Sequence, residues 1–207
     1  QPGATFVDVG AHIGYYSLEA ATVVGQNGRV IAIEPNPEIL PILRGNVTAS
    51  DAKSVAVWPV ACSESESTLE LYASQGGNTG ETSLSKANAS QEGQATVPYS
   101  VRARSLDAIL DESMVSRVDV IKIDVEGAEL SVLKGAVQTL AKYHPVLIIE
   151  IVPYQLKAMG TSIEEVQQFL TIHGYAASRH IDDLNIEFVP SKATAVRIEK
   201  QARAKTL

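Results

Sequence analysis

Cysteine is almost absent from the sequence, which contains Cys62 alone among 207 residues. A single cysteine excludes an intrachain disulfide framework and a zinc cluster built from several thiolates. It is compatible with a reducing compartment, and we expect a cytoplasmic protein. The four histidines form no pair at the spacing of metal ligands. The sequence therefore predicts no histidine or cysteine metal centre.

Basic residues are also scarce, with 17 Lys and Arg against 24 Asp and Glu and a net charge of −7. Binding to nucleic acid or to an anionic membrane surface requires concentrated positive charge, so neither partner is favoured. No apolar run approaches the roughly 18 to 20 residues of a membrane-spanning helix. With one Trp and three Phe, a broad aromatic platform for a substrate is not expected. The sequence does not predict an oligomeric state.

The composition that remains, 45% hydrophobic and 20% charged, is typical of one globular domain, and we expect residues 1–207 to form a single domain. The first residue is Gln1 rather than methionine. This start is compatible with trimming or processing of the N-terminus, and the sequence does not decide whether a segment is missing.

Short apolar runs rich in β-branched residues predict strands covered on both faces, and amphipathic stretches between them predict helices. The strands are expected at residues 5–9, 30–33, 118–125 and 146–151. The helices are expected at residues 15–24, about 37–47, 128–142 and, after capping residues, from 163 to Gly174. Pro41 is expected to disturb the early turns of the second helix. The alternation predicts βαβ units, followed by strands at residues 175–180, 186–189 and 194–198.

The middle of the sequence lacks this alternation. Residues 55–60, 68–72 and 96–103 are expected to be strands. Residues 74–94 between the last two are polar and rich in Gly, Ser, Asn, Thr and Gln, which predicts a long loop. Such a loop is typical of a lid, a binding loop or a mobile connection.

A glycine turn is expected where the first strand meets the first helix, with Gly10 and Gly14 flanking His12. Glycines at this position let the backbone approach a ligand, and the helix N-terminus offers unpaired N–H groups. Glu34, twenty residues after Gly14, ends the second strand, where a carboxylate can accept hydrogen bonds from ribose hydroxyls. Together these features predict a nucleoside site. The alternative is that the glycines only permit tight packing and Asp8 is a buried, hydrogen-bonded carboxylate.

The spacing distinguishes between nucleoside ligands. A dinucleotide fingerprint requires glycine at the third and sixth positions from Gly10, which are occupied by His12 and Tyr15. A nucleotide-dependent oxidoreductase is therefore the less favoured alternative. Asp8, two residues before Gly10, instead suits a ligand with a cationic amino-acid tail such as S-adenosylmethionine.

A second group of charges lies inside an apolar strand. Strand alternation directs Lys122, Asp124 and Glu126 to one face, at the edge where ligands bind in open α/β sheets. Glu150 occupies the same place at the end of the next strand. Burying such charges without partners costs several kcal/mol each, so they are either paired with one another or face a polar ligand.

These motifs resemble those of the FkbM-type methyltransferases, a branch of the class I S-adenosylmethionine-dependent enzymes. The matching segments are residues 7–17, 33–37, 105–107, 121–135 and 148–150, within a resemblance covering residues 5 to about 175. The resemblance implies a Rossmann-like α/β fold with a seven-stranded, mostly parallel sheet and helices on both faces. It implies methyl transfer to a hydroxyl of a sugar or secondary metabolite. His12 departs from the Asn that the family often has at this position.

The resemblance also implies roles for individual residues. Asp8, Gly10, His12 and Gly14 would line the methionine portion or shape its turn, Glu34 would hold the ribose, and Ala61 and Cys62 would lie near adenine. Asp124 would lie beside the transferred methyl group. We expect the catalytic residues to be Asp124, Glu126 and Glu150, with Asp124 or Glu126 removing the proton of the acceptor hydroxyl.

Two alternatives to this interpretation remain open. The same three carboxylates could hold a divalent cation that acts as a Lewis acid, although we do not favour a metal. The fold could also serve as a binding module without turnover, because a fold does not by itself establish an activity.

Overall fold

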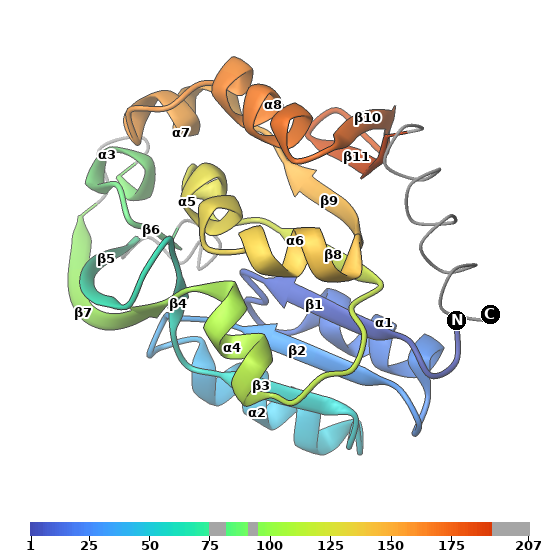
Figure 1. The fold of residues 1–207 in the computed structure, drawn as a ribbon. Coiled ribbons are helices and arrows are strands. Elements are labelled where there is room, and N and C mark those ends of the chain that lie inside the picture. The colour runs from blue at the N-terminus through green and yellow to red at the C-terminus, as the bar shows by residue number, and fades with distance from the viewer. Residues whose placement is uncertain (75–81, 91–94, 192–207) are drawn as a thin grey trace.

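The computed structural model describes residues 1–74, 82–90 and 95–191. Its main sheet has seven strands in the order β10-β11-β9-β8-β1-β2-β3 (Figure 1). The strands are β1 Thr5–Val9, β2 Arg29–Ile33, β3 Val55–Trp58, β8 Val120–Ile123, β9 Val146–Glu150, β10 Tyr175–His180 and β11 Asn185–Pro190. All neighbours pair in parallel except β11, which is antiparallel to both β9 and β10. β1 lies between β2 and β8. The strands β2 and β3 are added on one side of β1 and the later strands on the other, and ligands bind at such a topological switch point.

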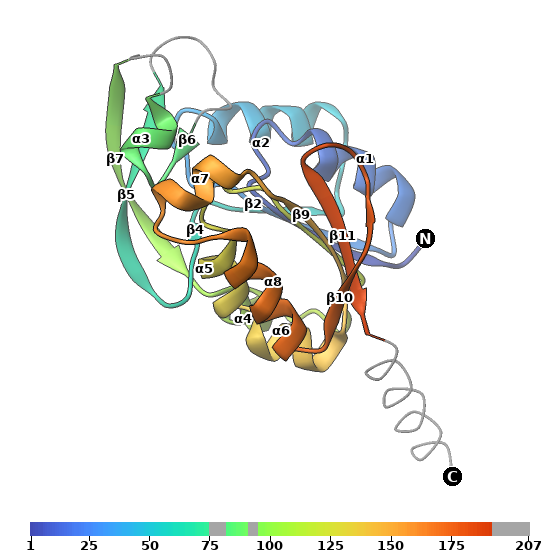
Figure 2. The same cartoon turned by 90° about the horizontal axis from the view of Figure 1, so that it is seen from above.

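Helices cover both faces of this sheet (Figure 2). One face carries α1 Tyr15–Val24 and α2 Leu40–Ala49. The other carries α4 Leu106–Glu112, α5 Glu129–Lys134, α6 Val137–Tyr143 and α8 Ile163–Ile172. Strand residues such as Val7, Ile31, Ile121 and Leu147 are almost completely buried between these layers. The predicted fold class is confirmed, and the nearly continuous apolar strands reflect burial on both faces.

A second, smaller sheet lies beyond the carboxyl ends of the main strands (Figure 1). Its strands are β4 Ala61–Cys62, β5 Ser67–Ser74, β6 Thr82–Ser83 and β7 Thr96–Arg104, in the order β4-β7-β5-β6. A short helix, α3 Lys86–Ala89, follows β6.

The prediction of a loop over residues 74–94 is therefore wrong at residues 82–83 and 86–89, while residues 75–81 and 91–94 lie outside the described ranges. Tyr72 pairs with Ser83, so tertiary pairing with β5 creates a strand whose two residues carry no periodic signal. The strand expected at residues 194–198 also lies outside the described residues.

The helices differ from the prediction in three places. The helix expected at residues 128–142 is divided into α5 and α6 at Gly135, where a Cβ atom would lie 2.1 Å from the carbonyl oxygen of Ser63. Pro41 falls in the first turn of α2, where a missing N–H is tolerated, so it does not disturb the helix. The structure adds α7 Pro153–Ala158, which was not predicted. No helix in the described part of the chain is long and apolar enough to cross a membrane.

Asp107 holds the start of α6. Its Oδ2 accepts a hydrogen bond from the Gln138 backbone N–H at 3.0 Å, and its Oδ1 accepts from the backbone N–H of Thr139 at 2.8 Å. The Thr139 hydroxyl also donates to Oδ1 at 2.7 Å. Asp107 is 30 residues distant in sequence from the helix, so it caps α6 through tertiary structure. This aspartate of the Ser-Leu-Asp segment is thus structural and lies outside the candidate site described below.

We expect Asp107→Ala to lower the free energy of unfolding by about 1–2 kcal/mol, because it removes the acceptor for the first N–H groups of α6. Urea denaturation of the purified protein measures this change. Asp111→Ala, an exposed aspartate on the same helix α4, is the matched control and should change stability by less than about 0.5 kcal/mol. Equal effects of the two substitutions would contradict the capping role.

Candidate active site

The turn after β1 brings two segments of backbone into close contact. Gly10 has a φ of 84°, and its N–H donates to the carbonyl oxygen of Ile33 at 3.0 Å. A Cβ atom on Gly10 would lie 1.8 Å from the carbonyl oxygen of Asp124. The Asp124 N–H in turn donates to the Val9 carbonyl oxygen at 3.0 Å. Only glycine therefore allows the end of β1 to pack directly against the end of β8.

Glu34 lies at the end of β2 and accepts two backbone hydrogen bonds. Its Oε2 accepts from the His12 N–H at 2.8 Å, and its Oε1 accepts from the Asn36 N–H at 2.8 Å. Burial raises the pKa of Glu34 to about 7, although both backbone donors oppose the shift. The glycine turn and the second strand are thus joined through one buried carboxyl group.

Charged residues also connect β1 with β8. Asp8 and Lys122 are partners in the register of the two strands. Lys122 is 4% exposed, and its Nζ donates to Asp124 Oδ2 at 2.7 Å and lies 4.7 Å from the centre of the Tyr16 ring. Asp8 is completely buried, and its Oδ2 accepts from the Ser17 hydroxyl at 2.6 Å. Burial raises the pKa of Asp8, while Lys122 lowers it.

Three carboxyl groups meet at the carboxyl ends of β8 and β9. One oxygen each from Asp124, Glu126 and Glu150 lies within 4.8 Å of the others, a separation that would suit a divalent cation. Burial, followed by the neighbouring Asp124 carboxylate, raises the pKa of Glu150 to about 7. This cluster combines a carboxylate paired with lysine and a carboxyl group that titrates near neutral pH.

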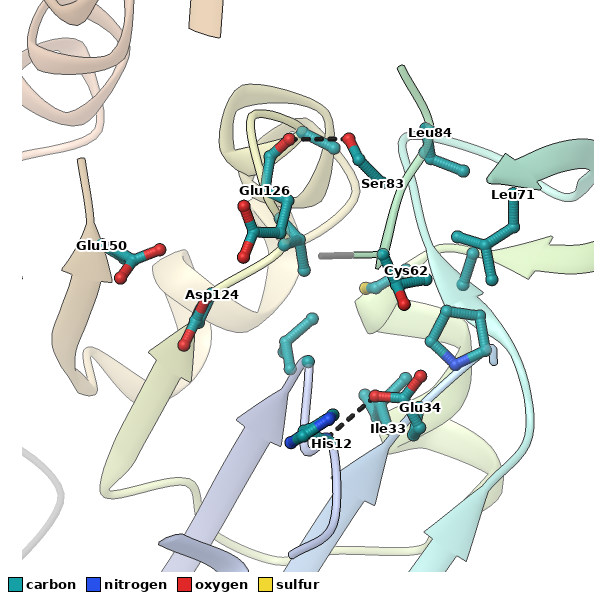
Figure 3. Close-up of a pocket in the computed structure, with 17 residues that line it drawn as sticks. His12, Ile33, Glu34, Cys62, Leu71, Ser83, Leu84, Asp124, Glu126 and Glu150 are labelled. Carbon is teal, nitrogen blue, oxygen red and sulfur yellow. Dashed lines mark hydrogen bonds between the residues drawn. The ribbon is translucent and has the colours of Figure 1, made fainter. Parts of the chain in front are cut away.

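These features surround a cavity of about 210 Å³ (Figure 3). Glu34 and His12 lie at one end, and Glu126, Asp124 and Glu150 lie at the other. Eight of the predicted site residues line the cavity: Gly10, His12, Glu34, Ala61, Cys62, Asp124, Glu126 and Glu150. Asp8 and Gly14 do not line it. Asp8 lies in the core under the turn, and Gly14 begins α1 with a φ of 93°.

The second sheet supplies another wall of the cavity. Leu71 of β5 and residues 82–84 line the cavity opposite the glycine turn. Leu71 lies in the strand expected at residues 68–72, whereas Thr82 and Ser83 are placed by pairing with β5, which no local pattern in the sequence indicates. Burial raises the pKa of the Cys62 thiol to about 12, so this residue contributes a neutral, apolar surface.

The sheet order and a cavity at the carboxyl edge next to β1 define a class I S-adenosylmethionine-dependent methyltransferase fold. A family model described as the methyltransferase FkbM domain matches residues 8–177. The chain therefore belongs to the FkbM methyltransferase family, which confirms the resemblance seen in the sequence.

The chain is also similar to individual proteins of known name. The chain is 28% identical over 214 residues to the AMB antimetabolite synthetase AmbE of Pseudomonas aeruginosa, covering 88% of this chain and 10% of that protein. It is 30% identical over 141 residues to the hexuronic acid methyltransferase AglP of Haloferax volcanii, covering 68% of this chain and 53% of that protein. The crystal structure of methyltransferase FkbM from Methylobacillus flagellatus superposes with a TM-score of 0.63 at 21% identity, covering 91% of this chain and 44% of that one. The chain thus spans about half or less of the length of these proteins.

We expect Gly10→Ala to lower the free energy of unfolding by about 2–4 kcal/mol, because the added Cβ would collide with backbone and the φ is positive. Gly45→Ala in α2 is the control: nothing lies within 4 Å of a Cβ there. That change should be neutral or stabilise by about 0.5–1 kcal/mol. Thermal and urea unfolding measure both effects, and a stable Gly10→Ala variant would refute the close packing of β1 against β8.

Proposed function

We propose that this chain transfers the methyl group of S-adenosylmethionine to a hydroxyl oxygen of a sugar or a small secondary metabolite. The observation that carries the proposal is that Glu34 and three further carboxyl groups line opposite ends of the same cavity. Glu34 follows the second strand, where a carboxylate can bind ribose hydroxyls. Membership of the FkbM family supports methyl transfer. The name of the relative AglP, a hexuronic acid methyltransferase, supports a sugar as the acceptor.

The residues around the cavity suit this cofactor. Both oxygens of Glu34 already accept backbone N–H groups and retain lone pairs for the hydroxyls of a ribose. Ile33, Cys62 and Leu71 offer an apolar surface for adenine. Gly10 exposes backbone to the ligand, and we assign the methionine portion to this end of the turn. Asp8 would act on this portion only through the turn that it supports, because it does not line the cavity.

When bound, S-adenosylmethionine supplies a methyl group on a positively charged sulfur, and the bonding electron pair remains on the sulfur as the neutral thioether leaves. The acceptor oxygen must lose its proton as its own electron pair forms the new bond to carbon. A carboxylate within hydrogen-bonding reach can accept this proton. We assign this role to Glu150.

Glu150 suits the role better than Asp124 because their environments differ. Asp124 forms an ion pair with the buried Lys122, so Lys122 Nζ already occupies one oxygen of its carboxylate. The pKa of Glu150 is raised to about 7, where a base is most effective at neutral pH. We therefore assign the general base to Glu150 instead of to Asp124 or Glu126, the residues expected from the sequence. The ion pair of Asp124 with Lys122 lies beside Glu150.

We expect Glu34→Ala to weaken binding of S-adenosylmethionine by about 10- to 100-fold, because it removes charge-assisted hydrogen bonds to the ribose. Isothermal titration calorimetry measures the dissociation constants. Glu19→Ala, an exposed glutamate of α1, is the control and should leave binding unchanged. Titration with NAD tests the oxidoreductase alternative, and binding of NAD in preference to S-adenosylmethionine would refute the proposal.

We expect methyl transfer to increase with pH and to level off above about 7, because Glu150 must be ionised to accept a proton. Glu150→Gln should lower kcat by about 10²- to 10⁴-fold and remove this pH dependence while leaving cofactor affinity nearly unchanged. A radiolabelled methyl donor and a panel of sugar and metabolite hydroxyls provide the assay, and Glu19→Gln provides the control.

A Glu150→Gln variant with full turnover would exclude Glu150 as the base. Inactivation by a chelator with recovery on adding Mg²⁺ would instead assign Asp124, Glu126 and Glu150 to a divalent cation.

A further inference from the structure

Glu126 has a backbone conformation that needs support from its surroundings. Its φ is 56°, in the left-handed region that side chains other than glycine rarely adopt, and Gly127 follows with a φ of 105°. The Glu126 carbonyl oxygen accepts hydrogen bonds from the Ser83 hydroxyl at 2.8 Å and from Asn88 Nδ2 at 2.9 Å. Residues of β6 and α3 thus hold the turn after β8 from the opposite wall of the cavity.

The side chain of Glu126 is hydrogen-bonded to a third element, α7. Gln155, a 5% exposed residue of α7, donates from its Nε2 to Glu126 Oε2. Asn88 Nδ2 also donates to the Gln155 carbonyl oxygen at 3.1 Å, which joins α3 to α7. A Cβ atom on Gly127 would lie 2.5 Å from that same carbonyl oxygen, so α7 packs directly on the turn. The backbone and carboxylate of Glu126 are therefore fixed together.

This arrangement directs the Glu126 carboxylate into the cavity, next to Asp124 and Glu150 (Figure 3). Asp124 has its charge balanced by Lys122, whose Nζ lies 2.7 Å from Asp124 Oδ2. Gln155 is neutral, so its hydrogen bond orients the Glu126 carboxylate without cancelling the negative charge. A fixed negative charge stabilises a positively charged ligand atom but has little effect on a neutral one.

We propose that Gln155 and Asn88 are positioning residues that hold the Glu126 carboxylate in the cavity, so that the site binds the cationic methyl donor in preference to its neutral thioether product. The inference rests on the proposed function, because it requires S-adenosylmethionine to be the ligand. It gives Gln155 and Asn88 a role in the exchange of the thioether product for a new molecule of the methyl donor, which the family assignment does not specify.

The ratio of two dissociation constants tests the proposal without a known acceptor. Calorimetric titration gives the affinities for S-adenosylmethionine and for S-adenosylhomocysteine, which differ in the charge on sulfur. We expect Glu126→Gln and Gln155→Met each to reduce the preference for S-adenosylmethionine by about 3- to 10-fold, with the affinity for S-adenosylhomocysteine nearly unchanged. Gln168→Met, the same substitution at an exposed position of α8, should leave both affinities unchanged.

A double variant separates positioning from a purely structural role. If Gln155 acts through Glu126, adding Gln155→Met to Glu126→Gln should produce no further change in the ratio. A Gln155→Met variant that has a lower Tm but an unchanged ratio overturns the positioning role, and additive effects in the double variant do the same. Should Gln155→Met fail to fold, Asn88→Ala replaces it, with the same expected loss of preference.

Failure of the proposed function gives a different result. If the unmodified protein binds neither S-adenosylmethionine nor S-adenosylhomocysteine, the proposed function fails and this inference fails with it. If it binds both, but no variant alters their ratio, only the inference is overturned.

Discussion

The contact between Gly10 and the Asp124 carbonyl oxygen determines the geometry of the whole candidate site. Two neighbouring parallel strands end at the same edge, and the missing Cβ of Gly10 lets their ends approach at backbone distance. The glycine turn then reaches Glu34 through the His12 N–H, while Asp124 lies on the other side of the same contact. The position of Glu34 relative to Asp124, at the two ends of the cavity, therefore depends on this close approach.

Buried charge at this edge lowers the stability of the folded chain. The pKa of Glu34 is raised from 4.5 to about 7, so ionised Glu34 costs the folded state roughly 3 kcal/mol. Because a raised carboxyl pKa disfavours the charged form, this cost is absent below pH 4.5 and complete above about 7. Hydrogen-bond donors on a ligand would offset it. A carboxyl group that is expensive to bury and lines a cavity is typical of a functional site.

Much of this arrangement could be predicted from the sequence because it depends on regular features. Continuous apolar runs predicted the strands of the main sheet, and the position of Gly10 and Glu34 at strand ends predicted that they would share an edge. Asp124 and Glu150 were expected at the ends of consecutive strands that pair in the sheet, and the parallel pairing of β8 with β9 confirms this, with Ile123 opposite Ile149.

The remaining features depend on tertiary contacts that no local pattern encodes. Residues 128–142 have continuous helical periodicity, yet packing of Gly135 against Ser63 divides the helix. β6 exists only because it pairs with β5, so the wall formed by residues 82–84 was predicted as loop. Asp8 was expected beside the ligand from its spacing to Gly10, but it lies in the core, where Ser17 accommodates its carboxylate.

The second sheet has an architectural property that follows from its pairing. Its first strand, β4, and its last, β7, are parallel neighbours, with Ala61 opposite Ala103 and Cys62 opposite Arg104. The chain thus leaves the main fold and returns to it at adjacent points, and the described residues between them form an insertion that begins and ends at neighbouring strands. Insertions of this kind can change in length or sequence without displacing the elements that flank them. Here, however, Ser63, Ser83 and Asn88 of this insertion contact Gly135 and Glu126, so the wall that the insertion forms is fastened to the turn after β8 on the other side of the cavity.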